Sequence, residues 1–327
     1  MSNETGEFPG GTGPNPTPPW AQNVLEKIAL EGLQEQRRAR RWGIFFKSLT
    51  FLFLFLLVVM VLGLIGKKEP AAASRHTALV ELHGVIDTEG KASADKIISG
   101  LQDAFKDPKT QGVVLRINSP GGSPVQSGRI NDEIHRLRKL HSTVPFYVVV
   151  EDICASGGYY VAVAADKIFV DKASLIGSVG VLMDGFGFTG AMEKLGVERR
   201  LLAAGENKGF LDPFSPLNQS QKEYAQKMLG EIHQQFITVV REGRGKRLKE
   251  TPDMFSGLVW TGEKSVELGL ADGYGSLQQV ARDVIKAEEI VDFTPEDNIA
   301  EKVARRLGAA SAEAMAKALM GKEAAFR

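Results

Sequence analysis

Residues 49–65 form a run of seventeen residues without a charge, LTFLFLFLLVVMVLGLI. Apolar residues from Trp42 onward extend the run upstream, where Lys47 is the one interruption by a charge. About 20 apolar residues are needed to span the hydrocarbon core of a bilayer, and the core helices of soluble proteins rarely stay apolar on every face. We therefore expect a transmembrane signal-anchor helix over 42–66, which places the residues before it and the residues after it on opposite sides of a membrane.

The alternative interpretation of this run is a cleaved signal peptide, with the alanines at 71–73 as a small-residue cleavage site. The preceding 41 residues are too long for an n-region and the apolar run is too long for an h-region, which favours an anchor. Lys67 and Lys68 directly follow the span, whereas five basic residues lie before or at its start: Arg37, Arg38, Arg40, Arg41 and Lys47. This bias predicts a cytoplasmic N-terminus, with the chain after about residue 67 on the extracytoplasmic side.

Composition excludes some classes of function. The 327 residues contain 40 Lys plus Arg and 40 Asp plus Glu, so no net field favours nucleic acid as a partner. Cys154 is the single cysteine, which excludes a disulfide within the chain and a cysteine cluster for metal. We expect neither a metal nor a cofactor. The predicted organisation is a cytoplasmic tail (1–41, disordered then helical), the anchor (42–66), a linker (67–75), a catalytic domain (76–292) and a C-terminal helical segment (293–327).

From about residue 76 strand-like and helix-like segments alternate, which predicts an α/β domain with largely parallel strands. Apolar runs such as those at 113–117 and 146–150 are typical of strands buried in a parallel sheet. The predicted strands are 78–82, 113–117, 146–150, 167–170 and 176–182. The predicted helices are 93–106, 124–140, 156–165, 219–243, 262–269, 276–288 and 297–320.

Two glycine pairs, Gly121-Gly122 and Gly157-Gly158, each lie between a predicted strand and a predicted helix. The first N–H groups of a helix have no partner inside it and favour an anion, and glycine lets the backbone approach a ligand closely. This arrangement suits the oxyanion of an attacked carbonyl, with Ser156 beside it as nucleophile. On these residues alone, a plain turn that starts a helix is the favoured explanation of each pair.

A serine nucleophile needs a base, and five histidines are available. None has a glycine-rich context, and His233 is the only one after Ser156, so a Ser–His–Asp triad is the lesser alternative. Lysine can act instead if its pKa falls by about 3 from its usual value of about 10.4, and burial causes changes of that size. Lys208 has apolar and glycine neighbours in a predicted loop after a strand, although a single lysine is usually a surface charge.

Five motifs together resemble the short, single-domain form of the signal peptide peptidase A family, the serine–lysine S49 peptidases. They span about 76–290 and occur in the family's order: NSPGG at 118–122, ASGGYY at 155–160, GSVGV at 177–181, AGENK at 204–208, and VWTG at 259–262 with GLAD at 269–272. The resemblance implies a crotonase-like, Clp-protease-like α/β spiral of ββα units. It also implies that Ser156 is the nucleophile, Lys208 the general base and Ser178 a lysine-orienting partner. Backbone N–H groups of Gly157 and of the Gly121–Gly122 turn would then hold the oxyanion.

The same resemblance implies a serine endopeptidase that cleaves peptides such as remnant signal peptides. We expect it in a bacterial inner membrane, with the bilayer and peptide substrates as partners and the catalytic domain in the periplasm. The short family members assemble as rings, so a ring-like homo-oligomer with sites completed by neighbours is expected. Two alternatives remain: a crotonase-like acyl-thioester enzyme, and a non-catalytic membrane scaffold.

Overall fold

The computed structural model describes residues 27, 37–38, 40–58 and 74–295. Its contacts divide the chain into one unit of residues 1–67 with 298–327 and another of residues 68–297. The disordered first part of the tail predicted over 1–41 and the helix predicted for 297–320 lie outside the described residues, as does most of the predicted linker.

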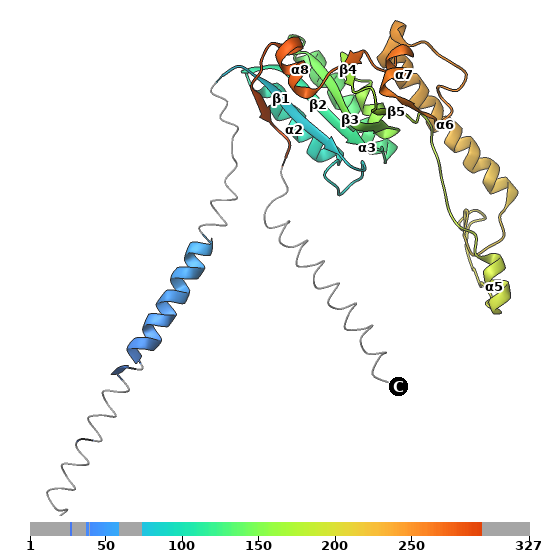
Figure 1. The fold of residues 1–327 in the computed structure, drawn as a ribbon. Helices are drawn as coiled ribbons and strands as arrows, with labels where there is room; N and C mark the ends of the chain where they lie inside the picture. The colour runs from blue at the N-terminus through green and yellow to red at the C-terminus, as the bar shows by residue number, and fades with distance from the viewer. Residues whose placement is uncertain (1–26, 28–36, 39, 59–73, 296–327) are drawn as a thin grey trace, which may run out of the picture. The chain divides into compact units, whose positions relative to one another are not determined.

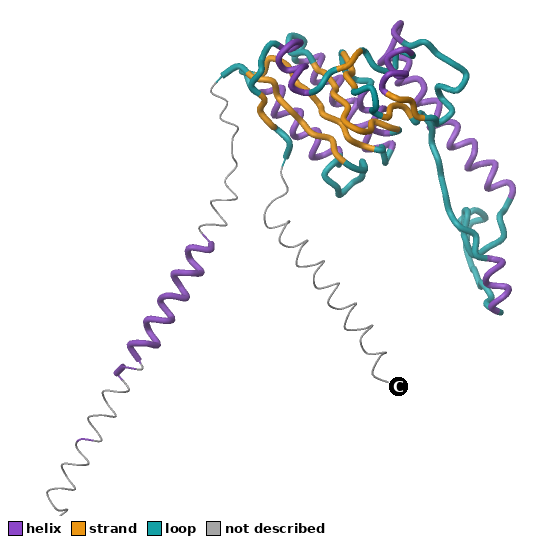
Figure 2. Tube along the Cα trace, viewed as in Figure 1, coloured by secondary structure: helices purple, strands orange, loops and turns teal. Residues whose placement is uncertain are grey.

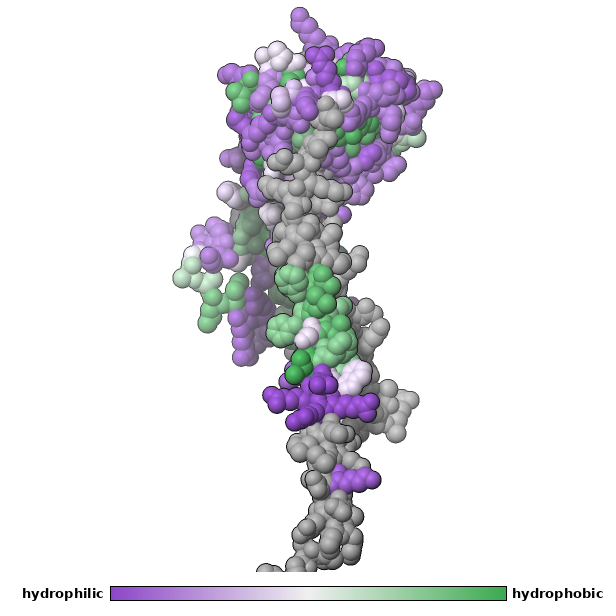
Figure 3. All heavy atoms as spheres, turned by 90° about the vertical axis from the view of Figure 1, so that its left-hand side faces the viewer, coloured by the Kyte–Doolittle hydropathy of each residue, from purple (hydrophilic) through white to green (hydrophobic). Residues whose placement is uncertain are grey.

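The first unit contains a continuous helix, Arg40–Val58, which is long and apolar enough to cross a membrane. None of its apolar window is buried, and Figure 3 shows hydrophobic side chains along it, with hydrophilic ones at one end. The Thr50 hydroxyl donates to the Phe46 carbonyl (2.9 Å), so it is satisfied within the helix. In the part of the chain that the structure describes, this is the one helix of that kind.

The second unit is built on an eight-stranded sheet with the order β6-β5-β3-β2-β1-β8, and β4 pairs with both β3 and β7. Every pair is parallel except β5 with β6, which confirms the predicted α/β class with largely parallel strands. The strands are β1 (His76–His83), β2 (Thr110–Ser119), β3 (Phe146–Ala155), β4 (Lys167–Val170), β5 (Leu175–Gly177), β6 (Val259–Thr261), β7 (Gly273–Tyr274) and β8 (Ile290–Asp292).

Helices cover both faces of this sheet (Figure 1). The main core lies between the sheet and helices α2 and α3. Strand residues on this face, such as Val80 of β1 and Leu115 of β2, lie in one buried cluster with Ile97 of α2 and Ile130 of α3. Alternate strand residues form a smaller cluster with Leu277 of α8 on the other face. The helices are α2 (Ala94–Lys106), α3 (Pro124–Leu140), α4 (Gly157–Ala162), α5 (Thr189–Leu195), α6 (Gln219–Arg244), α7 (Gly262–Glu267) and α8 (Leu277–Gln279), with a 3-10 turn η1 (Gly245–Arg247) and a π-helical η2 (Val280–Ile285).

Several predicted elements were wrong in extent, and β2 and β3 are longer than the strands predicted at 113–117 and 146–150. The strand expected over 176–182 ends at Gly177, because Gly177 (φ 112°) and Ser178 (φ 53°) leave the extended conformation. The helix expected over 276–288 divides into α8 and η2 and ends at Ile285, because the next residue, Lys286, is left-handed (φ 65°). The short strands β6, β7 and β8 were missed, since two or three residues carry no readable alternation.

Residues 180–217, here called the arm, leave the sheet after β5 and end just before α6, which leads the chain back to the sheet (Figure 1). Figures 1 and 2 show the arm, including α5, away from the sheet, and α5 has no buried residue. The arm contacts the first turns of α6, where the Leu211 N–H donates to Gln221 Oε1 (3.1 Å) and Phe210 meets Tyr224 with ring centroids 5.9 Å apart. The second half of α6, by contrast, buries Phe236, Ile237, Val240 and Arg244.

Candidate active site

Ser156 lies between the last residue of β3 and the first residue of α4, and it is partly exposed. Its backbone adopts φ 50° and ψ −122°, a conformation that costs a non-glycine residue about 1–3 kcal/mol and persists only when its surroundings impose it. The Ser156 N–H donates to the Gly177 carbonyl of β5 (2.8 Å), which is one of those constraints. A strained serine at a strand-to-helix turn has the local geometry of an exposed nucleophile.

The Gly121–Gly122 turn packs directly against this serine. A Cβ at Gly121 would lie 2.6 Å from the Gly157 nitrogen and 2.7 Å from Ser156 Cβ, and a Cβ at Gly122 would lie 2.1 Å from the Ile86 carbonyl oxygen. Both glycines also have positive φ, 99° and 147°. Only glycine fits at either position without moving the backbone, so the two glycine pairs predicted from the sequence form one local structure.

The backbone donors at this turn are not equivalent. The Gly121 N–H already donates to Ser119 Oγ (3.1 Å). The N–H groups of Gly122 and Gly157 find no acceptor among the described residues, and Gly157 opens α4, where the helix offers none. A Cβ built on Gly157 would lie 3.2 Å from the Gly122 nitrogen, so the two free donors are close together. Such a pair suits an oxyanion beside Ser156.

Ser178 is the second serine held at positive φ in this region. Its N–H donates to the Leu258 carbonyl (2.7 Å), and it directly follows Gly177, whose carbonyl binds the Ser156 N–H. The structure therefore brings the backbone of Ser178 close to that of Ser156, and its role as a lysine-orienting partner stays a prediction. Its hydroxyl makes no hydrogen bond within the described ranges.

Lys208 lies elsewhere in the molecule. It is exposed in a turn of the arm, where its N–H donates to the Gly205 carbonyl (3.1 Å), and its ammonium has no partner among the residues that the structure describes. The predicted loop is present, but the strand expected before it is not. The turn touches α6 at Gln221, which accepts from Leu211 and donates to Asn207 Oδ1 (3.4 Å).

Helix α6 contacts both this turn and the segment that follows β5, at different points along its length. The segment after β5 touches α6 at His233, whose Nε2 lies 3.1 Å from the Val179 carbonyl. Gln221 and His233 are twelve residues apart, which is about 18 Å along a helix. The turn that holds Lys208 and the segment that follows β5 therefore contact α6 at points separated by more than the length of a lysine side chain.

Two hydrogen bonds hold α4, and sequence reasoning missed both. The Tyr159 hydroxyl is buried and donates to the Leu270 carbonyl (2.8 Å), while Asn131 Nδ2 of α3 donates to the Tyr160 carbonyl (2.8 Å). Burial raises the pKa of Tyr159 well above its usual value, so the phenol stays a neutral donor. The partners are 29 and 111 residues apart, and no local pattern reveals such pairs.

A buried ion pair supports the same side of the site. Arg244 has no exposed side-chain surface and contacts Asp272 Oδ2 (2.8 Å), and Arg247 contacts Asp272 Oδ1 (3.1 Å). Burial alone would raise the pKa of Asp272, but hydrogen bonds and charge from Arg244, the Ile168 N–H and Arg247 outweigh it and lower the pKa. The GLAD motif at 269–272 thus ends in a structural carboxylate that ties α6 to β4.

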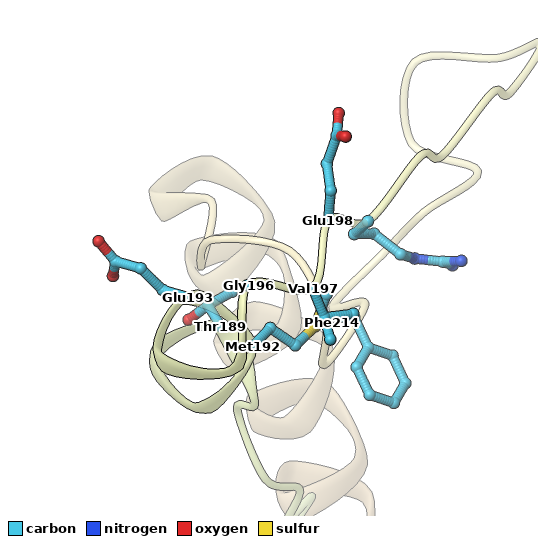
Figure 4. Close-up of a pocket in the computed structure, with 8 residues that line it drawn as sticks. Thr189, Met192, Glu193, Gly196, Val197, Glu198 and Phe214 are labelled. Atoms are coloured by element: carbon cyan, nitrogen blue, oxygen red, sulfur yellow. The ribbon is translucent and has the colours of Figure 1, made fainter.

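A hollow of about 340 Å³ lies in the arm, not at Ser156 (Figure 4). Apolar Met192, Val197 and Phe214 line it together with charged side chains, of which Arg199 contacts Asp212 (3.3 Å). No group of His, Cys, Asp or Glu that could hold a metal ion occurs in the described part of the chain.

Comparison with known proteins places these features in a family. The model of "Peptidase family S49" matches residues 138–291. "Putative protease MJ0651" of Methanocaldococcus jannaschii is 35% identical over 215 residues, 64% of this chain and 68% of that protein. "Putative signal peptide peptidase SppA" of Enterococcus faecium is 27% identical over 234 residues, 69% of this chain and 67% of that protein.

A Brucella abortus protein named "Na(+)/H(+) antiporter NhaA" is 43% identical over 216 residues, which are 64% of this chain but only 29% of that protein. The chain thus matches less than a third of this longer relative. Together with the fold and the strained serine, these matches show that the chain belongs to peptidase family S49, the family of signal peptide peptidase A. The resemblance inferred from the five motifs is confirmed.

Proposed function

We propose that this chain is a membrane-anchored serine endopeptidase with Ser156 as nucleophile and Lys208 as general base. One observation carries the proposal: Ser156 stands in a strained turn at the end of β3, beside the free N–H groups of Gly122 and Gly157. Membership of a peptidase family supports the same reaction class.

The chemistry is acyl transfer. Neutral Lys208 takes the proton of the Ser156 hydroxyl as Oγ attacks the peptide carbonyl, and the resulting ammonium gives a proton to the leaving amine. The N–H groups of Gly122 and Gly157 bind the oxyanion, where one such donor contributes about 2.7–4 kcal/mol in the transition state. Water then hydrolyses the acyl-enzyme through the same oxyanion position.

The base comes from a neighbouring copy in a ring-like homo-oligomer. Support comes from the separation of about 18 Å along α6, which keeps the Lys208 turn of each chain away from its own Ser156. A head-to-tail contact that repeats with rotation closes into a ring. Enclosure between two copies would also favour the neutral lysine that the reaction needs.

The arm has the surface expected of such an interface. Large apolar side chains on it are unusually open to solvent in the single chain: Leu182 and Phe186 are 80% exposed, Leu195 is 77% and Leu202 is 96%. The hollow at Met192, Val197 and Phe214 could receive an apolar side chain of the neighbour. Monomers rarely leave so many apolar side chains uncovered in one segment.

The substrates we propose are membrane-associated peptides, signal-peptide remnants among them. The apolar helix Arg40–Val58 would hold the protease at a membrane, with its N-terminus cytoplasmic and its catalytic domain outside, in a bacterial inner membrane. The name of the Enterococcus faecium relative, a putative signal peptide peptidase, supports the substrate class.

Complementation tests the nucleophile and the shared site together. Ser156→Ala and Lys208→Ala chains, carrying different tags, are produced separately and together, and peptide cleavage is measured on the purified assemblies. We expect no activity from either alone and recovered activity from the mixture, because some interfaces then pair an intact Ser156 with an intact Lys208. Co-purified mixtures without activity would contradict the shared site, and cleavage by Ser156→Ala alone would contradict the nucleophile.

A further inference from the structure

His233, in the middle of α6, makes a contact that the proposed reaction does not use. Its Nε2 lies 3.1 Å from the carbonyl oxygen of Val179, and the ring is partly buried. A carbonyl oxygen only accepts hydrogen bonds, so Nε2 carries a hydrogen and donates it. This nitrogen is therefore occupied as a donor and is not available as a base.

This hydrogen bond is the third of three that hold the backbone of residues 177–179, next to the nucleophile. The Gly177 carbonyl accepts from the Ser156 N–H (2.8 Å), and the Ser178 N–H donates to the Leu258 carbonyl (2.7 Å). Val179, the next residue, accepts from His233. Three successive residues are thus each fixed to a different part of the fold: the start of α4, the loop before β6, and α6.

The residue in the middle of this row needs to be held. Ser178 has φ 53°, which a non-glycine residue rarely adopts and which persists only under constraint. The hydrogen bonds of Ser178 and Val179 lie on either side of this strained position. Immediately beyond, a Cβ at Gly180 would lie 3.1 Å from Gly257 Cα, and from there the arm departs.

We propose that His233 is a positioning residue of the active site: by binding the Val179 carbonyl it holds Ser178 beside Ser156 and fixes the root of the arm that carries Lys208. The inference rests on the proposed function. His233 acts through these residues and touches neither substrate nor reacting atoms.

The test compares His233→Leu with His233→Gln in the full-length protein. Glutamine keeps a side-chain N–H donor, whereas leucine keeps bulk and removes the donor. We expect His233→Leu to lower kcat by about tenfold, the scale of one lost hydrogen bond at the reacting geometry, with KM changed by less than about twofold. His233→Gln should stay within about threefold of wild type. The matched control is His135→Leu, an exposed histidine on α3 whose loss should leave kcat unchanged.

A second readout does not depend on activity. Hydrogen exchange measured by mass spectrometry should become faster in peptides covering 177–181 in His233→Leu, and not in His233→Gln or His135→Leu, because the lost bond frees this segment. Unchanged exchange in His233→Leu, or equal losses of kcat in the leucine and glutamine variants, would overturn the positioning role.

Ser156→Ala in the same assays distinguishes a failure of the role proposed for His233 from a failure of the proposed function. If Ser156→Ala is inactive and His233→Leu cleaves like wild type, the role of His233 is wrong and the proposed function stands. If Ser156→Ala remains active, the proposed function is wrong, and the exchange data alone then decide whether His233 holds the 177–181 segment.

Discussion

Replacing Gly122 with alanine perturbs the predicted oxyanion site without touching Ser156. The new Cβ would lie 2.1 Å from the Ile86 carbonyl oxygen, well inside contact distance, and alanine is strained at φ 147°. Ile86 cannot yield freely, because its carbonyl accepts from the Ser123 N–H (2.8 Å) and its N–H donates to the Gly121 carbonyl (2.8 Å). The turn itself must move, and the Gly122 N–H moves with it.

The magnitude follows from the loss of one of two donors. Removing a single oxyanion donor typically lowers kcat by about 10²–10³, or about 2.7–4 kcal/mol. We therefore expect Gly122→Ala to lose at least about a hundredfold in kcat. A loss of stability of about 1–3 kcal/mol should accompany it, from strain at a positive φ.

The matched control is Gly128→Ala, six residues further on and inside α3. A Cβ there meets nothing within 4 Å, and alanine replaces glycine in a helix interior. That change should stabilise the protein by about 0.5–1 kcal/mol and leave kcat unchanged. Peptide cleavage and thermal unfolding by circular dichroism are measured on both variants, so a loss of activity through unfolding is recognised at once.

The result that would refute this reasoning is a folded Gly122→Ala protein with kcat within about threefold of wild type. The Gly122 N–H would then not serve the transition state. Equal losses of activity in Gly122→Ala and Gly128→Ala would also refute it, because the structure gives the second position free space.

Three further predictions concern stability and topology. Arg244→Met should lower the midpoint of thermal unfolding by about 6–12 °C, since breaking a buried pair costs about 3 kcal/mol even with a second arginine on Asp272; a fall below about 2 °C would contradict this. The folded-state pKa of Asp272 is lowered, so its stabilisation is present above its ordinary pKa and is lost as the pH falls through the lowered value. Asp272→Asn should therefore flatten the fall in the free energy of unfolding, measured with urea, below about pH 5, and an unchanged acid dependence would argue against it. Burial keeps Cys154 unreactive and raises its pKa, so an introduced cysteine can be labelled on its own to report the membrane topology. Glu89→Cys should react with an impermeant thiol reagent in intact spheroplasts, and Gly10→Cys should not. The reverse labelling pattern would mean that the orientation is inverted.

Long elements were predictable from the sequence because their periodicity is strong. The helix over 124–140 was predicted with its observed bounds, since Ile130, Ile134 and Leu137 repeat along one face. The end of β5 was not predictable. Apolar residues continue past Gly177 in the sequence, but the backbone turns there. Residues 177–179 are bound in succession by Ser156, Leu258 and α6.

The site was predictable in part, because some of its residues are marked by local sequence motifs. The glycines beside Ser156 are local signals, and the structure unites them through contacts that only glycine permits. The place of the Lys208 turn depends on the length of α6 between the arm and the core, and no motif encodes that length. The roles of Tyr159, Arg244 and His233 likewise rest on partners 25 or more residues away.

The most direct measurement of the central claim is covalent labelling of the full-length protein with a fluorophosphonate, followed by mass spectrometry of the peptides. Ser156 should carry the adduct, because an activated serine beside oxyanion donors reacts with such probes as it would with a substrate. Ser156→Ala should take up no label under the same conditions, while Gly128→Ala should label like wild type. An adduct on another residue, or labelling of Ser156→Ala at the wild-type rate, would contradict the account.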